Sequence, residues 1–134
     1  MADLVVVATA VLPYTGCATD VANAGEAITA GQAVYMHTDG TLLKAITTSA
    51  ITAAARGVAL NGGAIGQPIT YVKSGGYNPG VACVVGVVYG VTDTAGGVGD
   101  VADRAAADFI TILGIGTTTS RIELSINRSG VAIA

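Results

Sequence analysis

Apolar and polar residues alternate most clearly near the end of the chain. Within residues 121–127, Ile122, Leu124 and Ile126 share one face of an extended segment, and polar residues share the other. Such strict alternation is typical of a half-buried strand. We therefore expect a strand here with its polar face toward solvent. Residues 109–115 form a second strongly apolar segment that predicts a strand.

Short apolar segments separated by turn residues also fill the first half of the chain. Residues 33–36 and 41–46 flank a Thr-Asp-Gly turn, where Gly tolerates positive φ, so they are expected to form an antiparallel hairpin. Residues 57–60 predict a short strand. Residues 69–72 predict another, which starts after Pro68 as strands can.

The remaining apolar runs are less regular. Residues 4–12 are a β-branched run that predicts a first strand or an arm, which pairs either within the domain or with the sheet edge of a neighbouring subunit. Residues 13–23 read as a loop. Residues 81–85 and 87–91 are nearly continuous apolar runs, typical of strands buried on both faces, with a bulge or bend at Gly86.

Few segments favour helix. The alanine-rich residues 49–55 predict one short helix, and residues 104–108 a single helical turn. Residues 74–80 and 94–99 are rich in turn residues and predict loops.

Together these segments predict about eight to ten short strands at intervals of roughly ten residues, a spacing that indicates a β-sandwich or barrel. The fold class is therefore all-β, with short antiparallel strands and at most one short helix. The 134 residues fit a single domain. Within it we distinguish an N-terminal arm or first strand, residues 1–22, from the sandwich or barrel domain, residues 23–134.

Composition changes the picture of the surface. Hydrophobic residues make up 51% of the chain and charged residues only 11%, less than half of the roughly 25% in an ordinary soluble domain. A charge-poor surface disfavours solubility as an isolated domain. We therefore expect other chains to cover part of the outer surface. Aromatic residues, at 4%, leave few rigid anchors for a small-molecule pocket.

The charge pattern excludes some partners. The net charge is −3, and the six basic residues are dispersed rather than clustered, which argues against binding DNA or RNA: Lys44, Arg56, Lys73, Arg104, Arg121 and Arg128. The apolar N-terminus is too short to span a bilayer and lacks the positive start of a signal peptide. We expect a chain made in the cytosol, with no membrane partner.

Candidate chemistry is sparse. His37 is the only histidine, beside a turn, with no partners for a catalytic or zinc site. Cys17 and Cys83 lack metal-binding spacing and favour two small, mostly buried thiols, with a disulfide as the minority interpretation. Four carboxylates lie in one glycine-rich region without the alternation of a calcium loop: Asp93, Asp100, Asp103 and Asp108. We predict no catalytic, cofactor-binding or metal residues, and no cofactor.

Two stretches carry a resemblance to a known group, GEAITAGQAVYMHTDGTLLKAI and RGVALNGGAIGQPITYV. With the C-terminal part from GVVYGV onward, they resemble small virion proteins encoded near the major capsid gene of tailed bacteriophages. The similarity spans about residues 25–134 and leaves out residues 1–21. It implies a capsid decoration (cement) protein rather than an enzyme. Such proteins sit as homotrimers on the outer capsid surface of the virion, bind the major capsid protein and reinforce the joints between capsomers.

Two other classes stay open. One is another virion part, such as a head-fibre base, a tail or a spike component. The other is a cellular β-barrel binding module similar to lipoyl domains, which present a modifiable lysine at a hairpin tip. Lys44 is expected inside a strand and Lys73 at the start of a loop, without the flanking Met of that family. An enzyme is the least favoured class.

Overall fold

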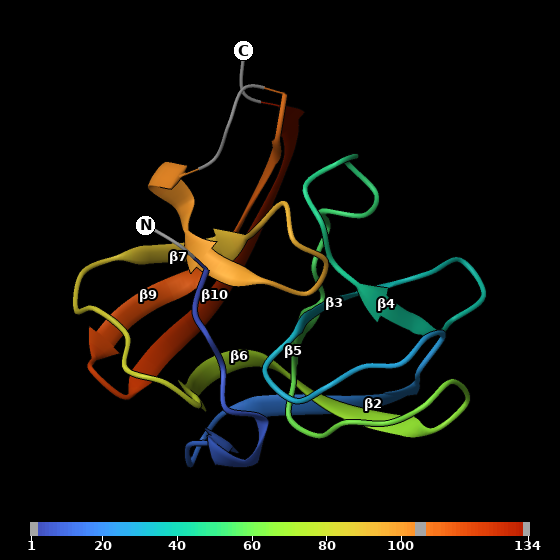
Figure 1. The fold of residues 1–134 in the computed structure, drawn as a ribbon, viewed down its shortest axis with the longest axis horizontal. Helices are drawn as coiled ribbons and strands as arrows, with labels where there is room; N and C mark the ends of the chain where they lie inside the picture. The colour runs from blue at the N-terminus through green and yellow to red at the C-terminus, as the bar shows by residue number, and fades with distance from the viewer. Residues whose placement is uncertain (1–2, 104–106, 133–134) are drawn as a thin grey trace.

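The described part of the chain, residues 3–103 and 107–132 of a computed structural model, forms one curled antiparallel sheet (Figure 1). The sheet closes into a half-barrel, which confirms the prediction of an all-β fold. Its strands follow the order β4-β3-β5-β6-β10-β9-β7-β8, and β1 and β2 also pair with β6. The strands are β1 (Val11–Pro13), β2 (Ala18–Asn23), β3 (Ala33–Met36), β4 (Leu42–Lys44), β5 (Gly57–Ala59), β6 (Pro68–Pro79), β7 (Val88–Val91), β8 (Val98–Asp100), β9 (Phe109–Thr118) and β10 (Arg121–Ala132), with two 3-10 turns, η1 (Ala8–Ala10) and η2 (Val101–Asp103).

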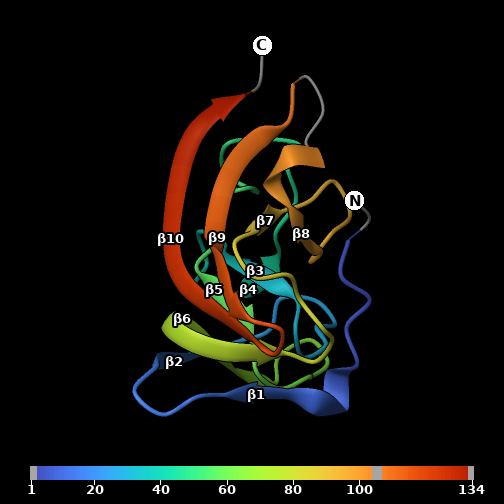
Figure 2. The same cartoon turned by 90° about the vertical axis from the view of Figure 1, so that its left-hand side faces the viewer.

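β6 joins the two halves of the sheet. Its first half pairs with β2 and β5, and its second half pairs with β1 and β10. Between these halves, Gly75 has φ of +90° and the register with β2 shifts. Left-handed φ bends a strand at little cost only when the residue is glycine. In Figure 2, β6 curves across the lower part of the molecule and β9 and β10 rise from it as long arcs.

The core lies on both faces of the sheet around β3, β5 and β6. Two groups of buried residues make it up. The barrel core fills the curled sheet and includes Ala33, Tyr35, Val58, Val72, Tyr77, Tyr89, Val91, Leu113, Ile122 and Leu124. The side core lies on the opposite face and comprises Ala24, Ile28, Val34, Leu42, Ala59, Ile69 and Tyr71. Successive residues of β3 and β5 thus enter different cores, so neither strand shows an alternating sequence pattern.

Several predicted strands are confirmed. β3 has the predicted bounds, and β4, β5, β7 and β9 fall on predicted segments. In β10, Ile122 and Leu124 are buried while Ser125 and Asn127 are exposed, as the alternation indicated.

The predicted helix at residues 49–55 is wrong, because this segment forms turns. The Ser49 hydroxyl accepts the backbone N–H of Thr52 at 3.1 Å, and the Thr52 hydroxyl donates to the Ile46 carbonyl at 3.0 Å. These local bonds satisfy backbone groups that a helix would otherwise use. Of the helical turn predicted at 104–108, residues 104–106 lie outside the described residues.

Four loop and strand predictions also need correction. The loop predicted at 94–99 ends before Val98, where β8 begins. Residues 18–23, expected in a loop, form β2, and most of the glycine-rich loop predicted at 74–80 belongs to β6. Residues 81–85, expected as a doubly buried strand, form a loop. In each case the pairing partner decided: β10 pairs with β6 at 74–77, β2 and β1 reach its other edge at Ser74 and Tyr77, and residues 81–85 pair with no described strand.

Substitution of Gly75 tests the bend in β6. A Cβ on Gly75 would lie 2.7 Å from Cys17 Cα, whereas one on Gly66, with φ of +85°, would meet nothing within 4 Å. Both alanine variants incur the left-handed penalty of about 1 kcal/mol, and only Gly75→Ala adds a backbone clash of about 1–3 kcal/mol. Urea unfolding is expected to show a loss of about 1 kcal/mol for Gly66→Ala and about 2–4 kcal/mol for Gly75→Ala. Equal losses would contradict this account.

Candidate interaction surfaces

Among the described residues of the predicted N-terminal segment, only residues 3–7 form an arm in the structure. This arm runs extended across the open side of the half-barrel (Figure 2). The Leu4 N–H donates to the Val98 carbonyl at 2.8 Å, and the Val7 N–H donates to the Gly80 carbonyl at 3.2 Å. The Thr92 hydroxyl donates to the Asp3 carboxylate at 2.8 Å. The sequence left open whether the arm pairs within the domain; in this structure it packs on its own chain.

Glycines shape the groove that holds the arm. A Cβ on Gly80 would lie 2.6 Å from the Val7 carbonyl oxygen, and one on Gly97 would lie 2.5 Å from an Asp3 carboxylate oxygen. A Cβ on Gly31 would collide with the Val6 side chain. A side chain at any of these glycines would push the arm outward. The arm groove is therefore fitted to an extended chain lying close to the backbone.

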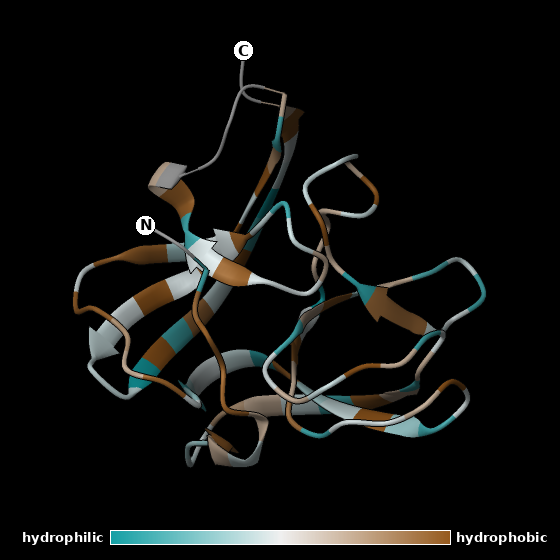
Figure 3. Cartoon of the chain, viewed as in Figure 1, coloured by the Kyte–Doolittle hydropathy of each residue, from teal (hydrophilic) through white to brown (hydrophobic). Residues whose placement is uncertain are grey.

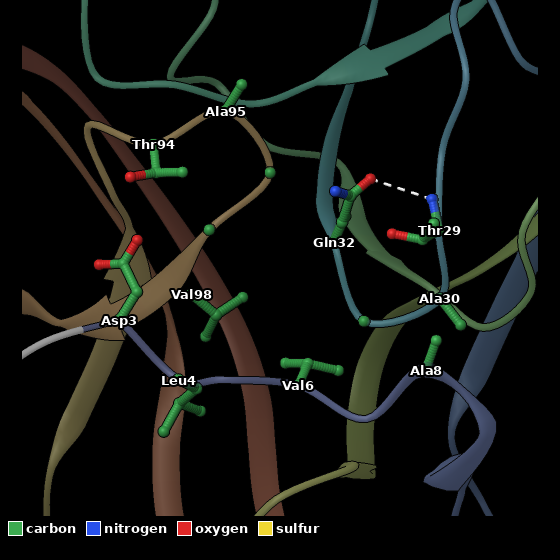
Figure 4. Close-up of a pocket in the computed structure, with 13 residues that line it drawn as sticks. Asp3, Leu4, Val6, Ala8, Thr29, Ala30, Gln32, Thr94, Ala95 and Val98 are labelled. Atoms are coloured by element: carbon green, nitrogen blue, oxygen red, sulfur yellow. Dashed lines mark hydrogen bonds between the residues drawn. The ribbon is translucent and has the colours of Figure 1, made fainter.

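A cavity of about 320 Å³ lies between the arm and the loops at residues 29–32 and 94–97 (Figure 4). Two of its polar side chains already have partners: Gln32 accepts the Thr29 N–H at 3.0 Å, and Asp3 accepts from Thr92. A ligand site needs polar groups that converge on the cavity. This cavity is better described as a space under the arm than as a binding pocket.

The arm is held by a small balance of free energies. Leu4 and Val6 are partly buried against the barrel core, worth together about 3 kcal/mol. The hydrogen bonds to Val98, Gly80 and Thr92 contribute about 1 kcal/mol each. Ordering the backbone of the arm costs on the order of 5–10 kcal/mol. The state with the arm in its groove and the state with the arm released therefore lie close in free energy.

The outer apolar patch is the name we give to apolar residues of β7, β9 and the loop before β7 that are exposed or half-buried: Val84, Val85, Val88, Ile112 and Ile115. Val88 of β7 and Ile115 of β9 are paired neighbours, exposed by 36% and 42%. Val84 and Val85, in the loop before β7, are exposed by 49% and 59%. A shallow groove of about 230 Å³ runs along Val88, Ile112 and Ile115. Figure 3 shows the hydrophobic bands of β9 and of this loop on the left-hand side.

Buried contacts hold the patch in place. The Tyr89 hydroxyl, in the barrel core, accepts the Val84 N–H at 2.9 Å and so fixes the loop. At the rim, the Arg121 guanidinium pairs with the Glu123 carboxylate at 2.8 Å. The two rim charges thus neutralise each other. An exposed apolar patch with a rim of this kind is typical of a protein–protein contact.

A second group of exposed apolar residues lies on the arm, β1 and β2. Val5 is 81% exposed, and Val7, Leu12 and Val21 are all more than half exposed. β2 pairs only with β6, so its other edge is open. The outer apolar patch and this second group are therefore two surfaces that the composition leads us to expect other chains to cover.

His37 follows β3 and lies in an exposed turn, as predicted. Its Nδ1 is 3.3 Å from the Asp39 carboxylate, which also accepts the Thr41 hydroxyl at 2.6 Å. Hydrogen bonds from Thr41 are the main reason that the pKa of Asp39 is lowered. These contacts stabilise the turn and give His37 no nucleophile to act on.

The cysteines are both free, Cys83 buried and Cys17 half-buried. The described residues contain no group of three or more His, Cys, Asp or Glu able to hold a metal; the side chain of Asp103 lies outside them.

Neither lysine lies at a hairpin tip. Lys44 ends β4 and lies 3.8 Å from Glu26. Lys73 lies within β6, not at the start of a loop, and is 3.6 Å from Asp20. The lipoyl-type interpretation has no support from these positions.

Sequence reasoning missed the outer apolar patch. Residues 81–85 read as a buried strand because apolar runs normally are. The available signal was the glycine at position 86. Gly86 has φ of +85° and lies in the turn beside the exposed Val84 and Val85. Sequence reasoning also missed the contact that holds Asp3. Its carboxylate accepts a hydrogen bond from Thr92, which is far away in the sequence.

No protein-family model and no curated protein matches this chain. Within the described residues, no helix has the length and apolar character needed to cross a membrane.

Thiol reactivity tests the burial of Cys83. Burial raises the pKa of its thiol, and Cys83 Sγ donates to the Thr118 carbonyl at 3.0 Å. Since the thiolate is the reactive form, Cys83 is expected to react with iodoacetamide slowly at pH 8. Mass spectrometry should find Cys17 modified first and Cys83 modified only after denaturation. Equal rates in the folded protein would contradict this assignment.

Proposed function

We propose that this chain is a structural virion protein that decorates and stabilises the outside of a tailed-phage capsid, as a homotrimer bridging capsomers. The observation that carries the proposal is the outer apolar patch, exposed on a chain with only 11% charged residues. Such a patch is expected to be covered by protein. The choice of the major capsid protein as partner rests on the sequence resemblance to phage decoration proteins.

Two different apolar surfaces favour a ring of copies. A cyclic trimer joins unlike surfaces head to tail, whereas a two-fold dimer joins one surface to itself. The chain offers one surface on β7 and β9, around Val88 and Ile115, and another on the arm and β2, around Val5 and Val21. Contact between the two in successive copies would close a ring.

The mechanism is mechanical rather than chemical. A shell filled with DNA is under internal pressure, and a clamp across capsomers opposes it by burying additional surface. Each copy adds a contact, and a trimer linked to several capsomers binds more tightly than one copy would. No residue is assigned a catalytic role, and no cofactor or small-molecule substrate enters the function.

Cosedimentation tests the proposal. The protein is expected to pellet with empty shells of the encoding phage and to bind its free coat protein scarcely. Val88→Asp places a charge in the surface where successive copies meet. It is expected to lower retention at least about ten-fold, because burying an unpaired carboxylate is costly and a single copy binds the shell less tightly than a trimer. Ile65→Asp, at another site that is 72% exposed, is the matched control and should bind as wild type.

Absence of the wild-type protein from the shell pellet would overturn the proposal. Equal loss for both aspartate variants would contradict the role of the outer apolar patch. A labelled copy seen by negative-stain microscopy on the tail, rather than the shell, would favour another virion part.

A further inference from the structure

The arm sequence is apolar on both faces, but only one face is covered. Leu4 and Val6 point into the barrel core, and Figure 4 shows them on the side of the cavity. Val5 and Val7 point away and are 81% and 54% exposed. A continuous β-branched run is typical of a strand with protein on both sides. In a single chain, the outward face of the arm has no such cover among the described residues.

The arm groove recognises this segment specifically. Gly31 and Gly80 leave room for Val6 and the Val7 carbonyl, and Gly97 leaves room for Asp3. The Thr92 side chain, fully buried at 0% exposure, donates its hydroxyl to the Asp3 carboxylate. The groove thus accepts an extended segment that begins with a carboxylate and continues with inward apolar residues at every second position.

The connection between arm and body is suited to a hinge. η1, Ala8–Ala10, has no buried residue and no side-chain cap. Two local bonds hold it, from Ala10 N–H to the Val7 carbonyl and from Val11 N–H to the Ala8 carbonyl. Beyond it, Val11 is buried and paired with Pro79, so the chain is anchored there. The arm can leave its groove while β1 stays in place.

We propose that the arm is exchanged between copies, so that residues 3–7 of one copy occupy the arm groove of a neighbour. Identical chains can make between themselves any contact that a terminal segment makes with its own body. The arm and η1 together span at most roughly 26 Å when extended, which reaches only a copy in direct contact. Exchange would place Val5 and Val7 at the boundary between two copies, where both faces of the arm are covered.

This inference concerns the protein alone and does not rest on the capsid. It predicts that the covalent link between arm and groove can form between two chains. A Cβ on Gly99 would lie 3.4 Å from Asp3 Cα, close enough for a disulfide between cysteines at these positions. Gly99 has no positive φ, so a side chain there is not strained by the backbone.

The test co-expresses two full-length chains, each with Cys17→Ser to remove the more accessible thiol. A tagged chain carries Asp3→Cys and an untagged chain carries Gly99→Cys. After mild oxidation, non-reducing gels are expected to show a tagged–untagged covalent dimer. The matched control replaces Asp3→Cys with Val5→Cys, whose side chain points out of the groove. The dimer yield should be at least about ten-fold lower in this control.

A single chain with both Asp3→Cys and Gly99→Cys shows whether the pair can form a bond at all. If this double variant oxidises only within one chain and the mixed pair gives no dimer, exchange is overturned. If the mixed pair and the Val5→Cys control give equal yields, the link is nonspecific, which also overturns it. Shell binding is measured separately, so its failure would leave this result unaffected.

Discussion

The fold depends on one strand that joins the two halves of the sheet. β2 and β1 pair with one edge of β6, β5 and β10 pair with the other, and the bend at Gly75 lets its two halves face different neighbours. Without that bend, β2 and β5 could not share a strand with β1 and β10. The two cores lie on opposite faces of the sheet, and β3, β5 and β6 contribute side chains to both. β6 and the strands that pair with it thereby determine where the arm and the outer apolar patch lie.

The low content of charged residues leaves much of the exposed surface of this chain apolar. A domain with this much apolar surface and this little charge is stable in solution mainly when neighbours cover it. Polar side chains such as His37 and Asp39 are engaged in turns. Large exposed apolar side chains lie on β7, β9 and the arm. Exposed apolar surfaces of this kind are suited to association with other chains.

The sequence predicted the elements whose signal is local. Alternation at Ile122 and Leu124 and the turn after β3 were sufficient because one buried face or one glycine determines each. The sequence did not predict the strands that form because of a partner distant in the chain. β2 and the second half of β6 have turn-like sequences but become strands because neighbouring edges pair with them. The exposure of Val84 was missed for the opposite reason, since its apolar run pairs with no strand among the described residues. No local pattern could reveal that Asp3 meets Thr92.

The central claim, that copies of this chain cover one another's apolar surfaces, is tested most directly by the mass of the purified protein in solution. Light scattering after size exclusion, over a wide concentration range, gives that mass without reference to shape. The account predicts three times the 13.1 kDa of one chain. A mass of one chain at every concentration would contradict it.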